Sequence, residues 1–138
     1  MSQNRIHNYF FAKAATLLNE GGILAFITTQ ATCDTPDNQF LRQHLVQSMH
    51  LISAVRLPHN LFDCGVGTDL LIFQKDSNKS SLSLREQQFT SLTEEEGVTI
   101  SSLFAYDGVG HILATDGRVS KDRYGKLYKR FIFNSEKL

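Results

Sequence analysis

The first thirty residues change from a helical hydrophobic period to a continuous apolar run. From Tyr9 to Leu18, apolar side chains recur at steps of three and four residues, which predicts a helix with one buried face. We expect that face to comprise Tyr9, Phe10, Ala14, Leu17 and Leu18. Gly21 and Gly22 predict the end of the helix, because glycine accepts the left-handed conformation that closes a helix C-terminus. The continuously apolar run 23–27 predicts a strand covered by helices on both faces.

The same order of elements then repeats. Residues 39–49 predict a helix, capped by Asp37 or Asn38, with one face formed by Phe40, Leu41, Leu45 and Val46. Residues 51–57 predict a strand that Pro58 ends by removing a hydrogen-bond donor. A third apolar run, 69–75, follows too closely for a helical crossover, so it should be antiparallel to its predecessor. The pattern therefore predicts an α/β fold whose last strand is antiparallel.

The second half of the chain is more polar. Residues 76–81, DSNKSS, predict an exposed boundary, which divides the chain into an α/β unit at 1–76 and an extension at 77–138. Within the extension we expect a polar linker, a short helix at 82–92 with Leu84, Gln88 and Leu92 along one side, and an acidic turn at 93–97. From Ile112 onward the pattern predicts a β-hairpin region, with Asp116-Gly117 and Tyr124-Gly125 as turn signals.

Composition favours a single hydrophobic core and no strong overall charge. The chain has 138 residues, and its fourteen basic residues balance fourteen acidic ones. Binding to a polyanion therefore requires a local cluster, and one basic cluster is present: Lys121, Arg123, Lys126, Lys129 and Arg130, interleaved with Tyr124, Tyr128 and Phe131. On a hairpin these side chains could contact a DNA backbone and stack on bases, although a solvated face is the simpler interpretation.

Other residues with chemical potential give weaker signals. The two cysteines, Cys33 and Cys64, form no CxxC pair, and the five histidines have no ligand spacing, so we expect a reduced intracellular protein without a metal. Asp34 and Asp37 flank Pro36, where capping of the loop is expected more than acid-base chemistry. Neither a membrane-spanning run nor a signal pattern is present, which predicts a cytoplasmic location.

Three separated blocks resemble a known family in order and spacing. The segments RIHNYFFAKAATLLNEGGILAFITTQAT, LISAVRLPHNLF and GTDLLIFQK resemble the latter half of the catalytic domain of N6-adenine DNA methyltransferases. The resemblance is to the large, helicase-associated methylase proteins of bacterial mobile elements, and the tail ATDGRVSKDRYGK resembles a segment that follows the domain in them. It implies a partial Rossmann-like class I methyltransferase sheet, with 23–27 as the fifth strand, followed by a small β-rich C-terminal extension.

The elements that such enzymes use for chemistry are absent from this sequence. The family binds S-adenosylmethionine over a glycine-rich turn after its first strand, and it orients the adenine with an Asn-Pro-Pro-Tyr or Asn-Pro-Pro-Phe loop after its fourth. Pro36 and Pro58 are the only prolines, and the GVG run at 65–67 is expected to be a tight turn rather than a cofactor loop. We therefore expect a methyltransferase fragment that is inactive alone, contains no catalytic residue and binds no cofactor by itself. Its expected partners are the missing N-terminal half and, through the parent enzyme, DNA.

The resemblance also suggests residues for the target-base side. Thr28 and Thr29 fall where the family has the wall of its adenine pocket, although they could instead hydrogen-bond the following loop. Phe62 matches an aromatic residue that stacks on the extruded base before the seventh strand, with core packing as the alternative. The approach from Asp63 to Asp69 is shorter than in the relatives. A different class of function stays open: a non-catalytic module, or a degenerate remnant, that forms a homo-oligomer through exposed sheet edges.

Overall fold

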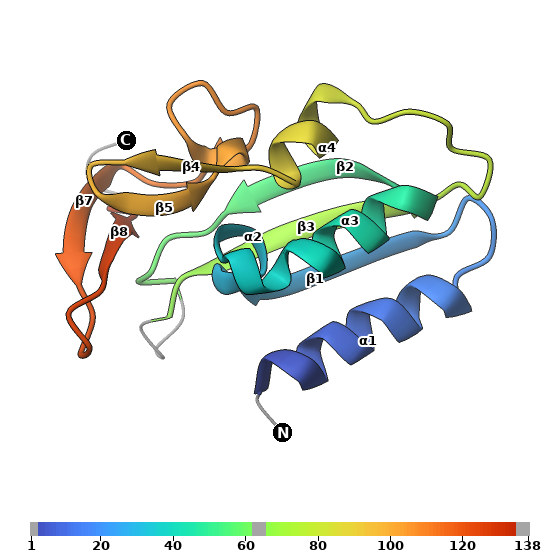
Figure 1. The fold of residues 1–138 in the computed structure, drawn as a ribbon. Helices are drawn as coiled ribbons and strands as arrows, with labels where there is room; N and C mark the ends of the chain where they lie inside the picture. Colours follow the sequence, from blue (N-terminus) through green and yellow to red (C-terminus); the bar gives the residue numbers. More distant parts are fainter. Residues whose placement is uncertain (1–2, 62–65, 135–138) are drawn as a thin grey trace.

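The chain forms four α-helices and eight β-strands in the computed structural model, which describes residues 3–61 and 66–134 (Figure 1). The helices are α1 (Gln3–Leu17), α2 (Ala31–Asp34), α3 (Gln39–Ser48) and α4 (Leu84–Phe89), with short 3-10 turns η1 (Pro36–Asn38) and η2 (Ser102–Phe104). The strands are β1 (Ile23–Thr29), β2 (Met49–Arg56), β3 (Thr68–Lys75), β4 (Leu92–Glu95), β5 (Val98–Ser101), β6 (His111–Ile112), β7 (Asp116–Lys121) and β8 (Leu127–Ile132).

A four-stranded sheet of order β1-β3-β2-β6 forms the frame of the molecule. Strand β3 lies between β1 and β2 and is antiparallel to both, as the short connection before it predicts. Strands β1 and β2 consequently run in the same direction, and β6 adds a short parallel pairing to β2. The carboxyl ends of β1 and β2 and the start of β3 therefore meet at one end of the sheet.

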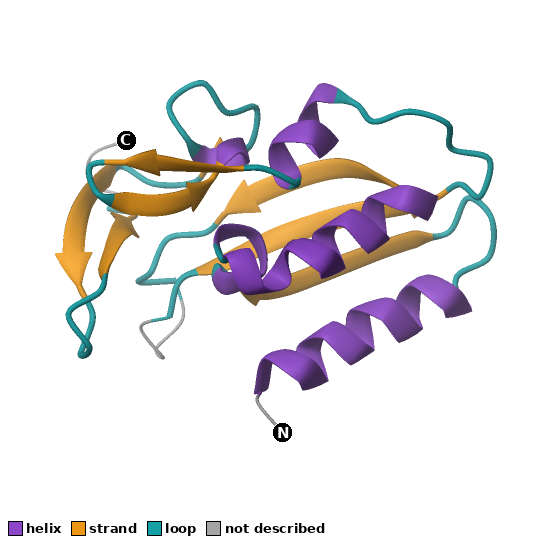
Figure 2. Ribbon diagram, in the orientation of Figure 1, coloured by secondary structure: helices purple, strands orange, loops and turns teal. Residues whose placement is uncertain are grey.

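The described helices cover one face of this sheet (Figure 2). From α1, Phe11 and Ala15 are buried, and the Phe11 ring lies 4.2 Å from the ring of Phe26 on β1, centroid to centroid. The expected α1 face was wrong at most of its positions, because Tyr9, Phe10 and Leu17 are exposed. Phe11, Ala15 and Leu18 share the same helical spacing, and contact with the sheet decides which set is buried.

Helix α3 buries Leu41, Leu45 and Val46, as expected, whereas Phe40 is 82% exposed. The expected caps are also wrong, since neither Asp37 nor Asn38 caps α3 through its side chain. The Asn38 amide instead donates to the carbonyl of Ala31 at 2.9 Å, which fastens η1 to α2.

The opposite face of the sheet carries no helix in the described part of the chain. Ile23 and Ile27 on β1 are 53% and 56% exposed, so the expectation of two covered faces is wrong within the described chain. In the ladder, Ile27 is paired with Leu70 and Ala25 with Ile72, so apolar side chains continue from β1 onto β3. Strand β1 also has a free outer edge among the described residues. We refer to Ile23, Ala25, Ile27, Leu70 and Ile72 as the bare face.

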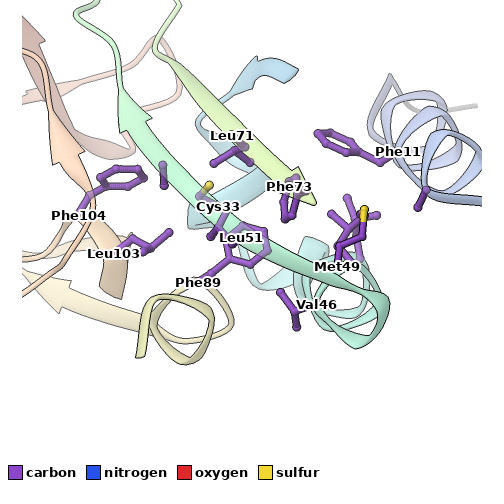
Figure 3. Packing of buried hydrophobic residues seen from close by; sticks show 14 of the residues in the cluster. Phe11, Cys33, Val46, Met49, Leu51, Leu71, Phe73, Phe89, Leu103 and Phe104 are labelled. Atoms are coloured by element: carbon purple, nitrogen blue, oxygen red, sulfur yellow. The ribbon is translucent and has the colours of Figure 1, made fainter. Parts of the chain in front are cut away.

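The second half packs on the same core as the first. Phe89 of α4 lies against Phe73 of β3, with ring centroids 5.9 Å apart, and Leu103 and Phe104 of η2 join the cluster (Figure 3). The buried ammonium of Lys79 forms an ion pair with Glu86. The hydrophobic core therefore takes side chains from both sides of the expected boundary at residue 76, and the domain division stays a prediction.

Three local expectations for this half need correction. Helix α4 is shorter than 82–92, and it buries Glu86 and Phe89 rather than Leu84, which is exposed. Most of the expected acidic turn at 93–97 is strand β4, which pairs with β5, and the reversal itself lies at Glu96 and Gly97, whose φ angles are 52° and 78°.

The C-terminal hairpin forms as expected, but with one turn signal misplaced. Gly125 has a φ of 80° and lies in the turn between β7 and β8, whereas Asp116 and Gly117 begin β7. No described helix is both long enough and apolar enough to cross a lipid bilayer.

The neighbouring phenylalanines of α1 provide a matched test of this packing. We expect Phe11→Ala, at a residue only 1% exposed, to lower the free energy of unfolding by about 3–5 kcal/mol because it opens a cavity against Phe26. Phe10→Ala, at a residue 59% exposed, should change it by about 0.5 kcal/mol or less. Urea denaturation measures both values, and equal losses would contradict the assigned orientation of α1.

Candidate functional site

A cavity of about 480 Å³ lies at the end of the sheet where β1 and β2 finish. In Figure 1, the β4–β5 and β7–β8 hairpins stand at this same end of the sheet. The residues that line the cavity come from the ends of β1 and β2, the start of β3, α2, β5 and the β7–β8 hairpin: Thr29, Gln30, Ala31, Asp34, Thr35, Arg56, His59, Val66, Gly67, Val98, Thr99, Ile100, Asp122, Arg123, Lys126, Leu127, Tyr128 and Lys129. Ligands of open α/β sheets lie beyond the carboxyl ends of strands, so this is the expected place for a site.

A buried ion cluster centred on Arg56 holds this end of the sheet together. Its guanidinium donates to both carboxylate oxygens of Asp69, at 2.8 and 2.9 Å, and to both oxygens of Asp34, at 3.0 and 2.9 Å. The Phe104 ring lies 4.3 Å from the guanidinium carbon, measured to the ring centroid. Burial opposes the charge of Arg56, but attraction to Asp69 and Asp34 outweighs it and raises the pKa of Arg56. The arginine is therefore a permanent, compensated cation.

Asp34 carries the cluster to a further element. Its Oδ1 accepts a hydrogen bond from the backbone N–H of Ser101, 2.9 Å away, which attaches the end of β5 to α2. Burial raises the pKa of Asp34, although attraction to Arg56 acts in the opposite direction. Asp37 is exposed. The Asp34 carboxylate accepts hydrogen bonds from Arg56 and Ser101, so its partners are not those expected of a side chain that caps its own loop.

Two polar side chains after β2 attach the β7–β8 hairpin to the sheet. The backbone N–H of His59 donates to the carbonyl of Phe131 at 2.7 Å, and the N–H of Phe131 donates to Nδ1 of His59 at 3.0 Å. Asn60 makes a similar reciprocal pair with the backbone of Phe133, at 2.9 and 3.1 Å. Nδ1 of His59 also lies 3.3 Å from the carbonyl oxygen of Phe131. Burial lowers the pKa of His59; a hydrogen bond with the backbone of Phe131 acts in the opposite direction, and the charges of Arg130 and Arg56 lower the pKa further.

Gly67 lines the cavity, and its lack of a side chain allows Gln30 and His59 to lie close to its backbone. A Cβ at this position would lie 2.3 Å from Cδ of Gln30 and 2.6 Å from Nε2 of His59. The carbonyl of Gly67 accepts a hydrogen bond from the N–H of Gln30 at 3.0 Å. Gly67 thus joins the start of β3 to the end of β1. The rest of the GVG turn includes Gly65, which lies outside the described residues.

The predicted base-side residues fall in three different places. Thr29 lines the cavity, whereas Thr28 is buried and its hydroxyl shares a hydrogen bond with Thr32 at 2.9 Å. Phe62 lies outside the described residues. The structure therefore places one of the three at the cavity, and the role of each stays a prediction.

The predicted DNA-contacting cations divide into two groups. Arg123, Lys126 and Lys129 line the cavity, while Lys121 and Arg130 are not among its lining residues. Lys129 forms an ion pair with Glu95 at 2.5 Å. Arg123 lies over the neighbouring Tyr124 ring, 5.8 Å from its centroid.

Sequence reasoning missed the roles of Arg56, His59 and Gln30. A single arginine at the end of the apolar run LISAVR, and Asp69 at the start of the next run, were the available signals for the ion cluster. His59 and its partner Phe131 are separated by 72 residues, so no local pattern predicts their contact.

Cys33 is buried in the hydrophobic core. Burial raises the pKa of Cys33 well above its ordinary value, and the Asp69 carboxylate adds to that shift, so the thiol is a poor nucleophile. Within residues 3–61 and 66–134, histidine, cysteine and acidic side chains form no group of three or more that could hold a metal ion.

The chain is similar in structure to two solved proteins. No protein-family model and no curated protein matches the chain. A solved structure from Listeria monocytogenes, assigned to the class I S-adenosylmethionine-dependent methyltransferases, has a TM-score of 0.50 and 22% identity, and covers 56% of this chain and 24% of that chain. The M protein of the type I restriction enzyme EcoKI has a TM-score of 0.47 and 27% identity, over 50% of this chain and 15% of that chain.

The similarity to the Listeria monocytogenes structure establishes the fold class. The chain has a mixed α/β fold with a partly parallel sheet that resembles a portion of a class I methyltransferase, together with small antiparallel hairpins. It spans less than a quarter of the length of either solved structure.

The burial of His59 predicts a dependence of stability on pH. Below about pH 6.5 the unfolded chain protonates this histidine, while the folded chain resists protonation because its pKa is lowered. The free energy of unfolding should therefore fall as the pH decreases from 7.5 to 5.5, by an amount on the order of 1 kcal/mol from this residue.

His59→Asn should remove that part of the pH dependence, because the asparagine Oδ1 can still accept from Phe131 but does not titrate. His44→Asn, at an exposed position of α3, is the control and should follow the parent chain. Urea denaturation at the two pH values gives the comparison, and an unchanged pH dependence in His59→Asn would contradict the lowered pKa of His59.

Proposed function

We propose that this chain is the C-terminal part of the catalytic domain of an S-adenosylmethionine-dependent N6-adenine DNA methyltransferase, and that it supplies part of the target-base side. Membership of the helicase-associated methylases of mobile elements, and a cytoplasmic location, belong to the same proposal. The fold supports it, because the sheet resembles a portion of a class I methyltransferase. The sequence blocks at residues 5–32, 51–62 and 67–75 support the adenine specificity.

The bare face is the observation that carries the proposal. Strand β1 is continuously apolar, yet Ile23 and Ile27 remain more than half exposed, and its outer edge has no described partner strand. Such a strand belongs inside a sheet with helices on both faces. A second polypeptide segment that adds strands beside β1 and helices over the bare face would complete the sheet, and we propose that the N-terminal half of the methyltransferase domain does so.

S-adenosylmethionine is assigned to that other half because the described residues do not fit it. A dinucleotide-type or methyl-donor site uses a glycine-rich turn and a free carboxylate for ribose hydroxyls. The two carboxylates that line the cavity already accept protein hydrogen bonds: Asp34 from Arg56, and Asp122 from the backbone of Tyr124 and Lys126. The cofactor would supply the methyl group, and this chain would position the DNA.

Positioning is a sufficient role for a part of the enzyme that contains no catalytic residue. The amino group of adenine is a weak nucleophile, and a misplacement of about 1 Å can slow such a reaction roughly a hundredfold. Thr28, Thr29 and Phe62 are the residues that we propose for the base side, and the basic side chains of the hairpin are proposed for the DNA backbone.

Reconstitution tests the proposal. The chain is co-expressed with a polypeptide that carries the glycine-rich turn and the Asn-Pro-Pro-Phe or Asn-Pro-Pro-Tyr loop of this enzyme class, and methyl transfer from radiolabelled S-adenosylmethionine to DNA is measured. We expect no transfer by either polypeptide alone and clear transfer by the pair. Ile27→Lys, on the bare face, should abolish assembly and transfer, whereas Gln43→Lys, at an exposed position of α3, should not.

Two results would contradict the proposal. Transfer by the chain alone would show that it is a complete enzyme. An inactive mixture in which the chain forms a stable homo-oligomer, disrupted by Ile27→Lys, would favour a non-catalytic module that associates through the β1 edge.

A further inference from the structure

One turn at the rim of the cavity carries two cations that form no ion pair among the described residues. Four cations line it, and Arg56 and Lys129 are neutralised by Asp34, Asp69 and Glu95. Arg123 and Lys126 are exposed, and neither forms an ion pair within the described part of the chain. The carboxylate of Asp122 lies in the same turn, where it accepts from two backbone N–H groups and so fixes the turn that carries both cations.

The wall beside this turn offers flat and apolar surfaces. The rings of His59 and Tyr128 lie 5.7 Å apart, centroid to centroid, and are inclined by 38°. Val98, Ile100 and Leu127 add apolar surface. His59 itself is buried, so Tyr128 is the ring of this pair that faces the cavity.

This combination matches the chemistry of a nucleotide. An aromatic ring in the wall suits a nucleobase, and cations at the rim suit the attached phosphates. The volume of about 480 Å³ lies within the range of roughly 300–1,000 Å³ that is usual for small-ligand sites. Two exposed cations hold a single phosphate weakly, whereas a strand brings successive phosphates to both of them.

We propose that this cavity binds one nucleotide of a single DNA strand, with the base against the half-buried Tyr128 ring, which the buried His59 ring supports from behind, and the flanking phosphates at Arg123 and Lys126. The inference rests on the proposed function and deepens it, because it makes the C-terminal hairpin one half of a nucleotide site. Lys121 and Arg130 do not line the cavity, so the proposal gives them no role in binding the nucleotide.

Two lysines of the hairpin provide the matched pair for the test. Lys126 lines the cavity and Lys121 does not, and both are exposed, so neither substitution should disturb the fold. Binding of a short fluorescein-labelled oligodeoxyadenylate to the purified chain is followed by fluorescence anisotropy over a series of salt concentrations. Lys126→Ala should lower the slope of log affinity against log salt by about 0.7, the value for one phosphate contact on a single strand. Lys121→Ala should leave the slope unchanged.

The stacking wall is tested separately. Tyr128→Leu keeps an apolar side chain but removes the ring, and it should weaken binding by about fivefold to a hundredfold. A thermal unfolding curve like that of the parent chain confirms that the hairpin is intact. Inorganic phosphate and S-adenosylmethionine are added as competitors, and neither should displace the strand at concentrations comparable to it.

Several results would overturn the inference. Equal effects of Lys121→Ala and Lys126→Ala would indicate a diffuse basic surface, and efficient competition by phosphate would indicate a simple anion site. Absence of binding by the chain would reject the nucleotide site but not the proposed function, which methyl transfer by the reconstituted pair tests independently. Binding without reconstituted transfer would retain the nucleotide site and reject the methyltransferase assignment.

Discussion

The paired charges of Arg56, Asp34 and Asp69 are the interaction on which the rest of this structure depends. An isolated buried guanidinium would be strongly destabilising, but here two carboxylates bind it through four hydrogen bonds. The three residues belong to β2, α2 and β3, and Asp34 also binds the end of β5. One buried cation thus fixes four segments at the same end of the sheet, and the cavity exists because those segments are held there.

The chain presents two surfaces of opposite character as a result. The end of the sheet is polar and cationic, since it combines strand ends with a hairpin that His59 and Asn60 bind through their side chains. The bare face is apolar and lies beside the free edge of β1. The first surface suits a charged ligand and the second suits a polypeptide, as the proposed function requires.

The sequence was sufficient to predict the elements whose determinants are local. Continuous apolar runs located β1, β2 and β3, and the short connection before β3 correctly predicted its antiparallel direction. The sequence did not decide between two local arrangements that fit its pattern equally well. Phe10 and Phe11 both fit a helical stripe, and only packing on Phe26 selects Phe11. The acidic residues of β4 resemble a turn, but their backbone pairs with β5.

The candidate site was predicted only in part for the same reason. Thr29 and three of the five hairpin cations do line the cavity, because each is attached to a strand end whose position the topology determines. Successive residues of a strand point to opposite faces, so Thr28 points into the interior, where its hydroxyl shares a hydrogen bond with that of Thr32. The Arg56 cluster and the bonds of His59 join residues far apart in the chain, so they become visible only in the folded structure.

The central claim is that the strand ends and the C-terminal hairpin together form the surface that meets DNA. Nuclear magnetic resonance spectra of the isotope-labelled chain, recorded while an unlabelled single strand of DNA is added, test this claim most directly. The account predicts that the backbone signals of Thr29, His59 and Tyr128 shift together, while those of Ile23 and Ala25 on the bare face do not. Shifts confined to the bare face, or spread evenly over the hairpin without the strand ends, would contradict it.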